Sequence, residues 1–65
     1  MAFQALTFHG VTNADQVNKI TTALMMLDGV DSVEVGRYGA EVEGRAKREA
    51  LIKAIEKLNL GVKVS

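Results

Sequence analysis

The middle of the chain decides the fold, and residues 27–43 read LDGVDSVEVGRYGAEVE. Apolar and polar residues alternate over residues 32–35 and again over residues 40–43, on either side of a segment bounded by Gly36 and Gly39. Alternation with a period of two indicates a strand with one buried face, and a short glycine-bounded segment between two such strands indicates a tight turn. We therefore predict a β-hairpin in the centre of the chain.

Helical periodicity occurs on both sides of this hairpin. Apolar side chains recur at steps of three and four from about residue 15 to residue 27, and again from about residue 46 to residue 58. This spacing places them on one stripe of a helix. Gly29 should end the first helix, because glycine readily takes the positive φ that closes a helix. The two stripes consist of Val17, Ile20, Leu24 and Leu27 in the first helix and of Leu51, Ala54, Ile55 and Leu58 in the second.

The two ends of the chain supply the remaining strands. Residues 3–9 alternate, with Leu6 and Phe8 on the apolar side, and Val62 and Val64 alternate with polar residues near the other end. The predicted order is β-α-β-β-α-β, in which two crossover helices cover one face of a four-stranded antiparallel sheet. We predict an α+β fold of the ferredoxin-like type, formed by residues 1–65 as a single domain.

Composition narrows the classes of function. The chain has 65 residues, 48% of them hydrophobic, and no cysteine, so aliphatic packing must hold the fold without disulfides or thiolate metal sites. Eight basic residues balance eight acidic ones, whereas binders of nucleic acid or anionic membranes need an excess of positive charge. We see no signal-peptide pattern and no apolar run of the roughly 18 residues that a membrane-spanning helix needs. We expect a cytoplasmic protein with no membrane insertion and no nucleic-acid partner.

The sequence also argues against an enzyme and against RNA binding by the open sheet face. It contains no HExxH, no Gly-x-x-x-x-Gly-Lys loop and no histidine paired by spacing with a serine or cysteine nucleophile. By alternation, the open face carries little aromatic surface beyond Phe3, whereas RNA-binding sheets stack bases on aromatic side chains. The other residues expected on that face are Ala5, Thr7, Glu34, Glu41 and Glu43, of which the acidic ones would repel phosphate.

Four motifs carry a family resemblance. They are Gly10-Val11-Thr12, Val17-x-x-Ile20-x-x-Ala23-Leu24, residues 27–35 and residues 51–58 (LIKAIEKL). Together they resemble the heavy-metal-associated (HMA) domain family of small copper chaperones and amino-terminal modules of copper-pumping ATPases. The resemblance implies the ferredoxin-like fold and a metal loop of glycine, a hydrophobic residue, Ser or Thr, and Cys-x-x-Cys before the first helix. Here Asn13 and Gln16 stand at the two cysteine positions.

Other residues near the expected metal loop also depart from the family pattern. Val11 replaces the methionine that is common after the glycine, and Asn59-Leu60 replaces the common Gly-Tyr or Gly-Phe after the second helix. The central hairpin is shorter than is usual. In the family, the loop after the second helix lies near the metal and helps to shield it, so several parts of this end have changed together.

Asn13 and Gln16 are unsuitable ligands for copper(I), a soft cation that prefers thiolate or thioether sulfur. We therefore expect no cofactor beyond weak binding of a divalent metal. Asparagine is a good N-cap, and glutamine three positions later returns a hydrogen bond to the backbone N–H of the cap. We hypothesise that these two residues form a capping box that orders the loop without metal. Thr12 with Asp15 has the same spacing, and the sequence does not decide between the two caps.

Weaker metal candidates lie close to this loop. His9 is the only imidazole, and with Asp15 and Gln16 it offers nitrogen and oxygen ligands for zinc or nickel. The competing interpretation of His9 is a solvent-facing strand residue.

A candidate partner surface consists of Val11, Met25 and Met26. The two methionines should lie on the side of the first helix turned away from its apolar stripe. Exposed methionine suits an adaptable contact surface, although such a pair can also be incidental or a soft-metal ligand. The second helix is basic, which indicates a solvated face or electrostatic docking to an acidic partner.

Two functions follow. The first is a non-catalytic HMA-like domain that has lost thiolate metal binding and serves protein interaction or regulation, with another HMA-like domain or a transporter as the partner. The alternative is a metal-binding or metal-transport chaperone for copper, zinc or nickel that uses non-cysteine ligands. The open sheet of a short chain also allows a weak homodimer.

Overall fold

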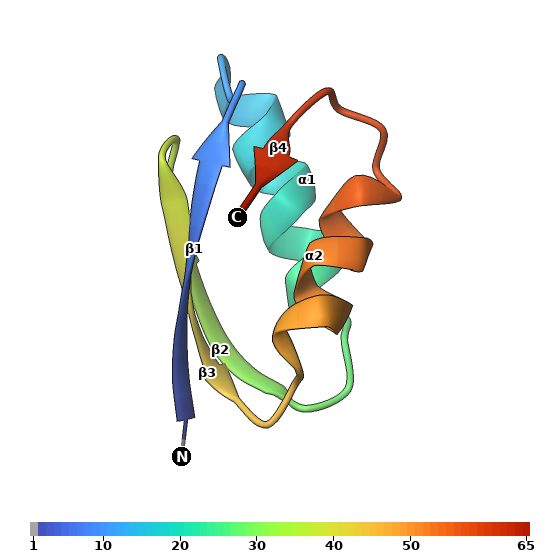
Figure 1. Cartoon of the computed structure of the whole chain (residues 1–65). Coiled ribbons are helices and arrows are strands. Elements are labelled where there is room, and N and C mark those ends of the chain that lie inside the picture. Colours follow the sequence, from blue (N-terminus) through green and yellow to red (C-terminus); the bar gives the residue numbers. More distant parts are fainter. Residues whose placement is uncertain (1) are drawn as a thin grey trace.

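The structure, a computed structural model, describes residues 2–65. Its elements follow the predicted order, and Figure 1 shows both helices on one face of the sheet. They are β1 (Ala2–His9), α1 (Ala14–Met25), β2 (Val30–Val35), β3 (Gly39–Gly44), α2 (Arg48–Glu56) and β4 (Lys63–Val64).

The sheet has the strand order β2-β3-β1-β4, and every neighbouring pair is antiparallel. β3 covers β1 from Ala2 to Thr7, whereas β4 pairs with β1 only at Phe8 and His9. The turn between β2 and β3 is closed by a bond from the Gly36 N–H to the Gly39 carbonyl, 2.8 Å. These features confirm the predicted ferredoxin-like fold and its central hairpin.

The core lies between the sheet and the two helices. Alternation along β1 buries Leu6 and Phe8, which are 3% and 2% exposed, and leaves Phe3, Ala5 and Thr7 on the open face. Burial of one large aliphatic side chain contributes about 1.5–3 kcal/mol, so a few such residues determine the stability of a chain this short. The largest fully buried side chains are Ile20, Leu24, Leu51, Ile55 and Val42.

The helices are shorter than their periodicity predicts, and backbone hydrogen bonds explain the difference. α1 ends at Met25 because the Leu27 N–H bonds to the Leu24 carbonyl at 3.2 Å, which tightens the last turn. α2 begins at Arg48, two residues after the predicted start, because the N–H of Ala46 donates to Gly29 O at 3.0 Å. No helix within residues 2–65 has the length and apolar character needed to cross a membrane.

Candidate functional site

The loop between β1 and α1 lies at the same end of the molecule as the loop between α2 and β4 (Figure 1). Gly10 brings the two loops together. Its φ of +102° is one that side chains rarely adopt, and a Cβ there would lie 3.0 Å from the carbonyl oxygen of Gly61. Glycine is therefore required at this position by both its conformation and the close approach of the second loop.

The second loop begins with Asn59, which stands where glycine is common in the family. α2 ends at Glu56, and the Asn59 N–H bonds to the Glu56 carbonyl at 3.1 Å. Asn59 has a φ of +57°. This left-handed conformation closes helices, and asparagine tolerates it better than other side-chain-bearing residues do. Asn59 can therefore take a backbone conformation that glycine also takes readily.

Asn13 and Gln16 form the predicted capping box at the start of α1. Asn13 is the N-cap, with φ −149° and ψ 164°, and its Oδ1 accepts from the Gln16 N–H at 2.9 Å. Gln16 Oε1 accepts from the Asn13 N–H at 3.2 Å. The alternative in which Thr12 caps the helix is therefore not the one adopted.

Gln16 binds the rest of the loop as well. Its Oε1 accepts from the Thr12 N–H at 2.6 Å and from Thr12 Oγ1 at 3.2 Å, and its Nε2 donates to the Leu60 carbonyl at 3.3 Å. One carboxamide thus connects the β1–α1 loop to the α2–β4 loop. This role could not be read from the sequence, because the acceptor at Leu60 is a backbone carbonyl that any residue provides.

Asn13 and Gln16 stand where the family has its two cysteines, and their side-chain oxygens already accept hydrogen bonds. Asn13 Oδ1 and Gln16 Oε1 each accept backbone N–H groups of this loop. Carbonyl oxygens are hard donors and unsuited to copper(I). A metal that took them would also leave the helix N-terminus with unsatisfied N–H groups. The loop therefore forms a helix cap in which both side-chain oxygens already have hydrogen-bond partners.

Each residue proposed for a nitrogen and oxygen site has another partner in the structure, and Gln16 is engaged in the capping box. His9 is exposed on β1, where its strand partner is Lys63. Asp15 Oδ2 lies 3.3 Å from Lys19 Nζ in an exposed pair along α1. Among residues 2–65, no three His, Cys, Asp or Glu side chains come together in a way that suits a metal ion. Weak binding of a divalent metal stays a prediction.

The partner-surface candidates divide into two groups. Met25 and Met26 are exposed, at 55% and 79%, at the C-terminal end of α1, away from the altered loop. Val11 is different, because it is only 8% exposed and belongs to the hydrophobic core. The placement of Val11 on the partner surface is therefore corrected. The loop turns this side chain inward, where it covers the end of the core instead of meeting solvent.

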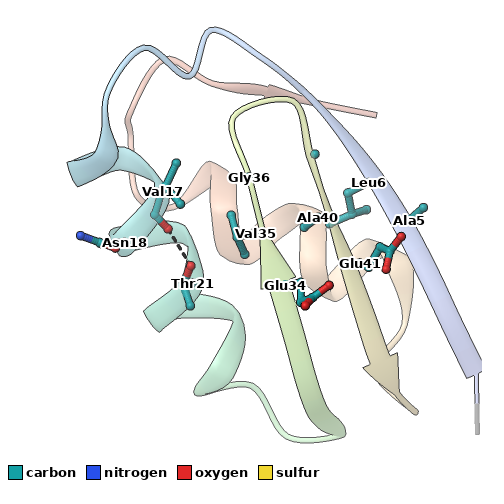
Figure 2. A pocket seen from close by; sticks show the side chains of 11 residues that line it. Ala5, Leu6, Val17, Asn18, Thr21, Glu34, Val35, Gly36, Ala40 and Glu41 are labelled. Atoms are coloured by element: carbon teal, nitrogen blue, oxygen red, sulfur yellow. Dashed lines mark hydrogen bonds between the residues drawn. The ribbon is translucent and has the colours of Figure 1, made fainter.

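Two open hollows adjoin this region. One lies between the loop and the hairpin tip and is lined by Thr12, Asn13, Ala14, Val17, Asn18, Gly36 and Arg37. The other runs from α1 across the end of β2 to the open sheet face (Figure 2). Thr21 Oγ1 in this hollow donates to the Val17 carbonyl at 2.8 Å, while Glu34 and Glu41, which are partners across β2 and β3, extend from the sheet.

The fold of this chain is similar to that of several solved structures. No protein-family model and no curated relative matches the sequence. The copper binding domain from HMA7, a P-type ATPase, superposes with a TM-score of 0.87 at 26% identity, covering 100% of this chain and 92% of that one. The N-terminal domain of a potential copper-translocating P-type ATPase from Bacillus subtilis, in its Cu(I)-loaded state, superposes with a TM-score of 0.85 at 26% identity. The match covers 97% of this chain and 82% of that one.

The CopZ metallochaperone shares the fold, with a TM-score of 0.87 at 22% identity over 98% of this chain and 100% of that one. The chain thus has the ferredoxin-like fold of the HMA domains found in copper chaperones and P-type ATPases, which confirms the resemblance. It has this fold without any cysteine.

Proposed function

We propose that this chain is a non-catalytic HMA-like domain that has lost thiolate metal binding and acts as a protein-interaction or regulatory module. One observation carries the proposal. The residues at the two cysteine positions hold each other in a capping box, with Gln16 bonded onward to Leu60. The loop is therefore held by hydrogen bonds from its own carboxamides, with no metal ligand needed to connect its parts.

Local interactions at the start of α1 stabilise the loop under this proposal. An asparagine N-cap contributes about 0.5–2 kcal/mol relative to alanine. Asp15 lies in the first turn of α1, where a negative charge adds about 0.3–1 kcal/mol through the helix dipole. The Asn13 cap, the Asp15 charge and the bond from Gln16 to Leu60 together keep the β1–α1 end of the domain folded. The surface of this end stays available for contacts.

The partner in this proposal is another protein, either an HMA-like domain or a transporter. The basis is similarity of fold to domains of P-type ATPases and to a metallochaperone. Met25 and Met26 supply exposed, adaptable apolar surface for such a contact. A cytoplasmic location, expected from the sequence, stays a prediction.

The alternative function is a metal carrier that uses non-cysteine ligands. It is favoured by the copper-binding character of the structural neighbours. It is disfavoured by the ligand chemistry of the loop, since oxygen donors already engaged in hydrogen bonds are weak competitors for copper(I).

Copper(I) competition against a chromogenic chelator, without oxygen, separates the two functions. We expect no stoichiometric copper in the wild type. The double variant Asn13→Cys with Gln16→Cys should bind one equivalent, because it restores two thiolates on a scaffold of the right fold. Each single cysteine variant is the matched control and should bind far less. Copper retained by the wild type as tightly as by the double variant would refute the proposal.

A further inference from the structure

β1 has one edge that is only partly covered. The N–H and C=O of Thr7 exchange two 2.9 Å bonds with Ser65, next to β4. Because backbone groups alternate along a strand, Phe3 and Ala5 direct theirs the same way, away from β3. Within residues 2–65 no strand lies against them. At Ala5, Arg48 Nη1 donates to the outward carbonyl at 2.9 Å.

The edge at β2 has charges and a register shift of its own, whereas the edge at β1 has neither and is contacted by the Arg48 side chain at Ala5. β2 carries Asp31 and Glu34, and its pairing with β3 shifts register between Val30 and Ser32. Charges and bulges of this kind discourage pairing with another chain. β1 reads AFQALTFH, with no Asp, Glu, Lys, Arg or Pro, and pairs with β3 without a shift. The β1 edge is therefore suited to receive another strand.

We propose that a second copy of this chain pairs with this edge, antiparallel, through Phe3–Ala5 of each copy. Two-fold symmetry permits only a few registers. Centring on Ala5 would set Phe3 against Thr7 of the second copy, which is already bonded to Ser65. Centring on Phe3 leaves Ala5 without a partner in the described β1. Placing the two-fold axis at Gln4 pairs Phe3 of each copy with Ala5 of the other. The outward backbone N–H and C=O groups of all four residues then have partners.

Side chains agree with this register. Phe3 is 72% exposed on the open face and would lie across from the small Ala5 of the second copy, so each copy accommodates the aromatic ring of the other. The formal net charge of the chain is +0, so the copies do not repel each other as wholes. Glu43 would lie three strands from Glu41 of the second copy, about 14 Å at about 4.8 Å per strand and beyond the Debye length of about 8 Å.

Arg48 is the residue that opposes this association. Its bond to the Ala5 carbonyl occupies one acceptor that the second copy needs. Arg48 is exposed and is the first residue of α2, where alanine is also a good helix former. Arg48→Ala should therefore leave the fold intact and strengthen the dimer several-fold. A variant that strengthens association cannot be explained by misfolding.

Sedimentation equilibrium over a concentration series, in EDTA, measures the association independently of any metal and of the proposed function. We expect a concentration-dependent dimer in the wild type. Phe3→Ala should weaken it about tenfold, because it removes from both copies the ring that packs across from Ala5. Tyr38→Ala, which removes an aromatic ring that is 79% exposed at the hairpin tip, is the matched control and should have no effect.

Ala5→Pro tests the backbone contact. It removes the outward N–H and fixes φ at about −65°, and proline is tolerated where a strand N–H faces away from its neighbour. The dimer should be lost while the circular dichroism spectrum is kept. A wild type that stays monomeric at millimolar concentration, or a dimer indifferent to both Ala5→Pro and Phe3→Ala, would overturn the proposal.

Single cysteines test the register, because the native chain has none. In the proposed pairing, Gln4 lies opposite Gln4 of the second copy at a Cα separation of about 4.5 Å, which a disulfide can span. Gln4→Cys should cross-link on oxidation with diamide, which takes up the two electrons released by the thiols. Phe3→Cys would cross-link if the two-fold axis passed through Phe3, and Ser32→Cys would cross-link if the copies paired through β2. Cross-linking of either of these in preference to Gln4→Cys would contradict the proposal.

Discussion

The hydrophobic core and the loop before α1 show two different kinds of sequence requirement. The core depends on apolar side chains at the right spacing, with Ile20, Leu24 and Leu51 fully buried. The loop depends on individual functional groups, since Asn13 and Gln16 each make directed hydrogen bonds. A scaffold can therefore stay close to its structural neighbours, at TM-scores of 0.85–0.87, while two positions change the functional groups that the loop offers.

The largest effect is expected in the core. Leu24→Ala should cost about 2–5 kcal/mol, because it leaves a cavity among fully buried neighbours. At about 0.05–0.15 kcal/mol per residue, a chain of 65 residues has only about 3–10 kcal/mol in total. Urea unfolding followed by circular dichroism should show partial or complete loss of the fold. Met26→Ala, at a residue that is 79% exposed, should change the free energy of unfolding by no more than about 0.5 kcal/mol.

The second largest effect is expected where the β1–α1 loop contacts the α2–β4 loop. Gly10→Ala should cost about 1–3 kcal/mol, because it places a side chain at φ +102° and 3.0 Å from the Gly61 carbonyl. Gly61→Ala is the control. Gly61 also has a positive φ, +74°, but nothing lies within 4 Å of its Cβ position. A smaller loss at Gly61 would separate close approach from backbone conformation, whereas equal losses would show that the contact between the loops does not matter.

The same contrast explains which features were predictable. Periodicity predicts the order of elements, and spacing predicts a cap at the start of the first helix, because both are local patterns. The choice of Asn13 over Thr12 as the cap comes from the structure. Helix ends were predicted less well. Ala46 is held outside α2 by the distant Gly29 carbonyl, a partner with no sequence signal. Val11 was misplaced for a related reason, since an irregular loop has no period from which to infer the direction of a side chain.

Within the loop, the cap itself should have a moderate effect. Asn13→Ala removes the acceptor for the Gln16 N–H and should cost about 1 kcal/mol, within the usual range of about 0.5–2 kcal/mol for an N-cap. Thermal unfolding measures the change. Asn18→Ala, at an exposed position inside α1, should be neutral or slightly stabilising, because alanine has the higher helix propensity. Equal stability of Asn13→Ala and wild type would argue against a cap that orders the loop.

The smallest effect isolates the bond between the two loops. Gln16→Glu keeps an oxygen that can accept from Thr12 and Asn13 but loses the Nε2 donor to the Leu60 carbonyl. The new charge is favourable near the N-terminus of α1, by about 0.3–1 kcal/mol. It offsets the loss of one hydrogen bond of about 0.5–1.5 kcal/mol. Stability should therefore change little at neutral pH, while amide hydrogen exchange in residues 59–62 should accelerate. Unchanged exchange there would mean that the α2–β4 loop is held by packing alone, and that the carboxamide serves only to close the helix.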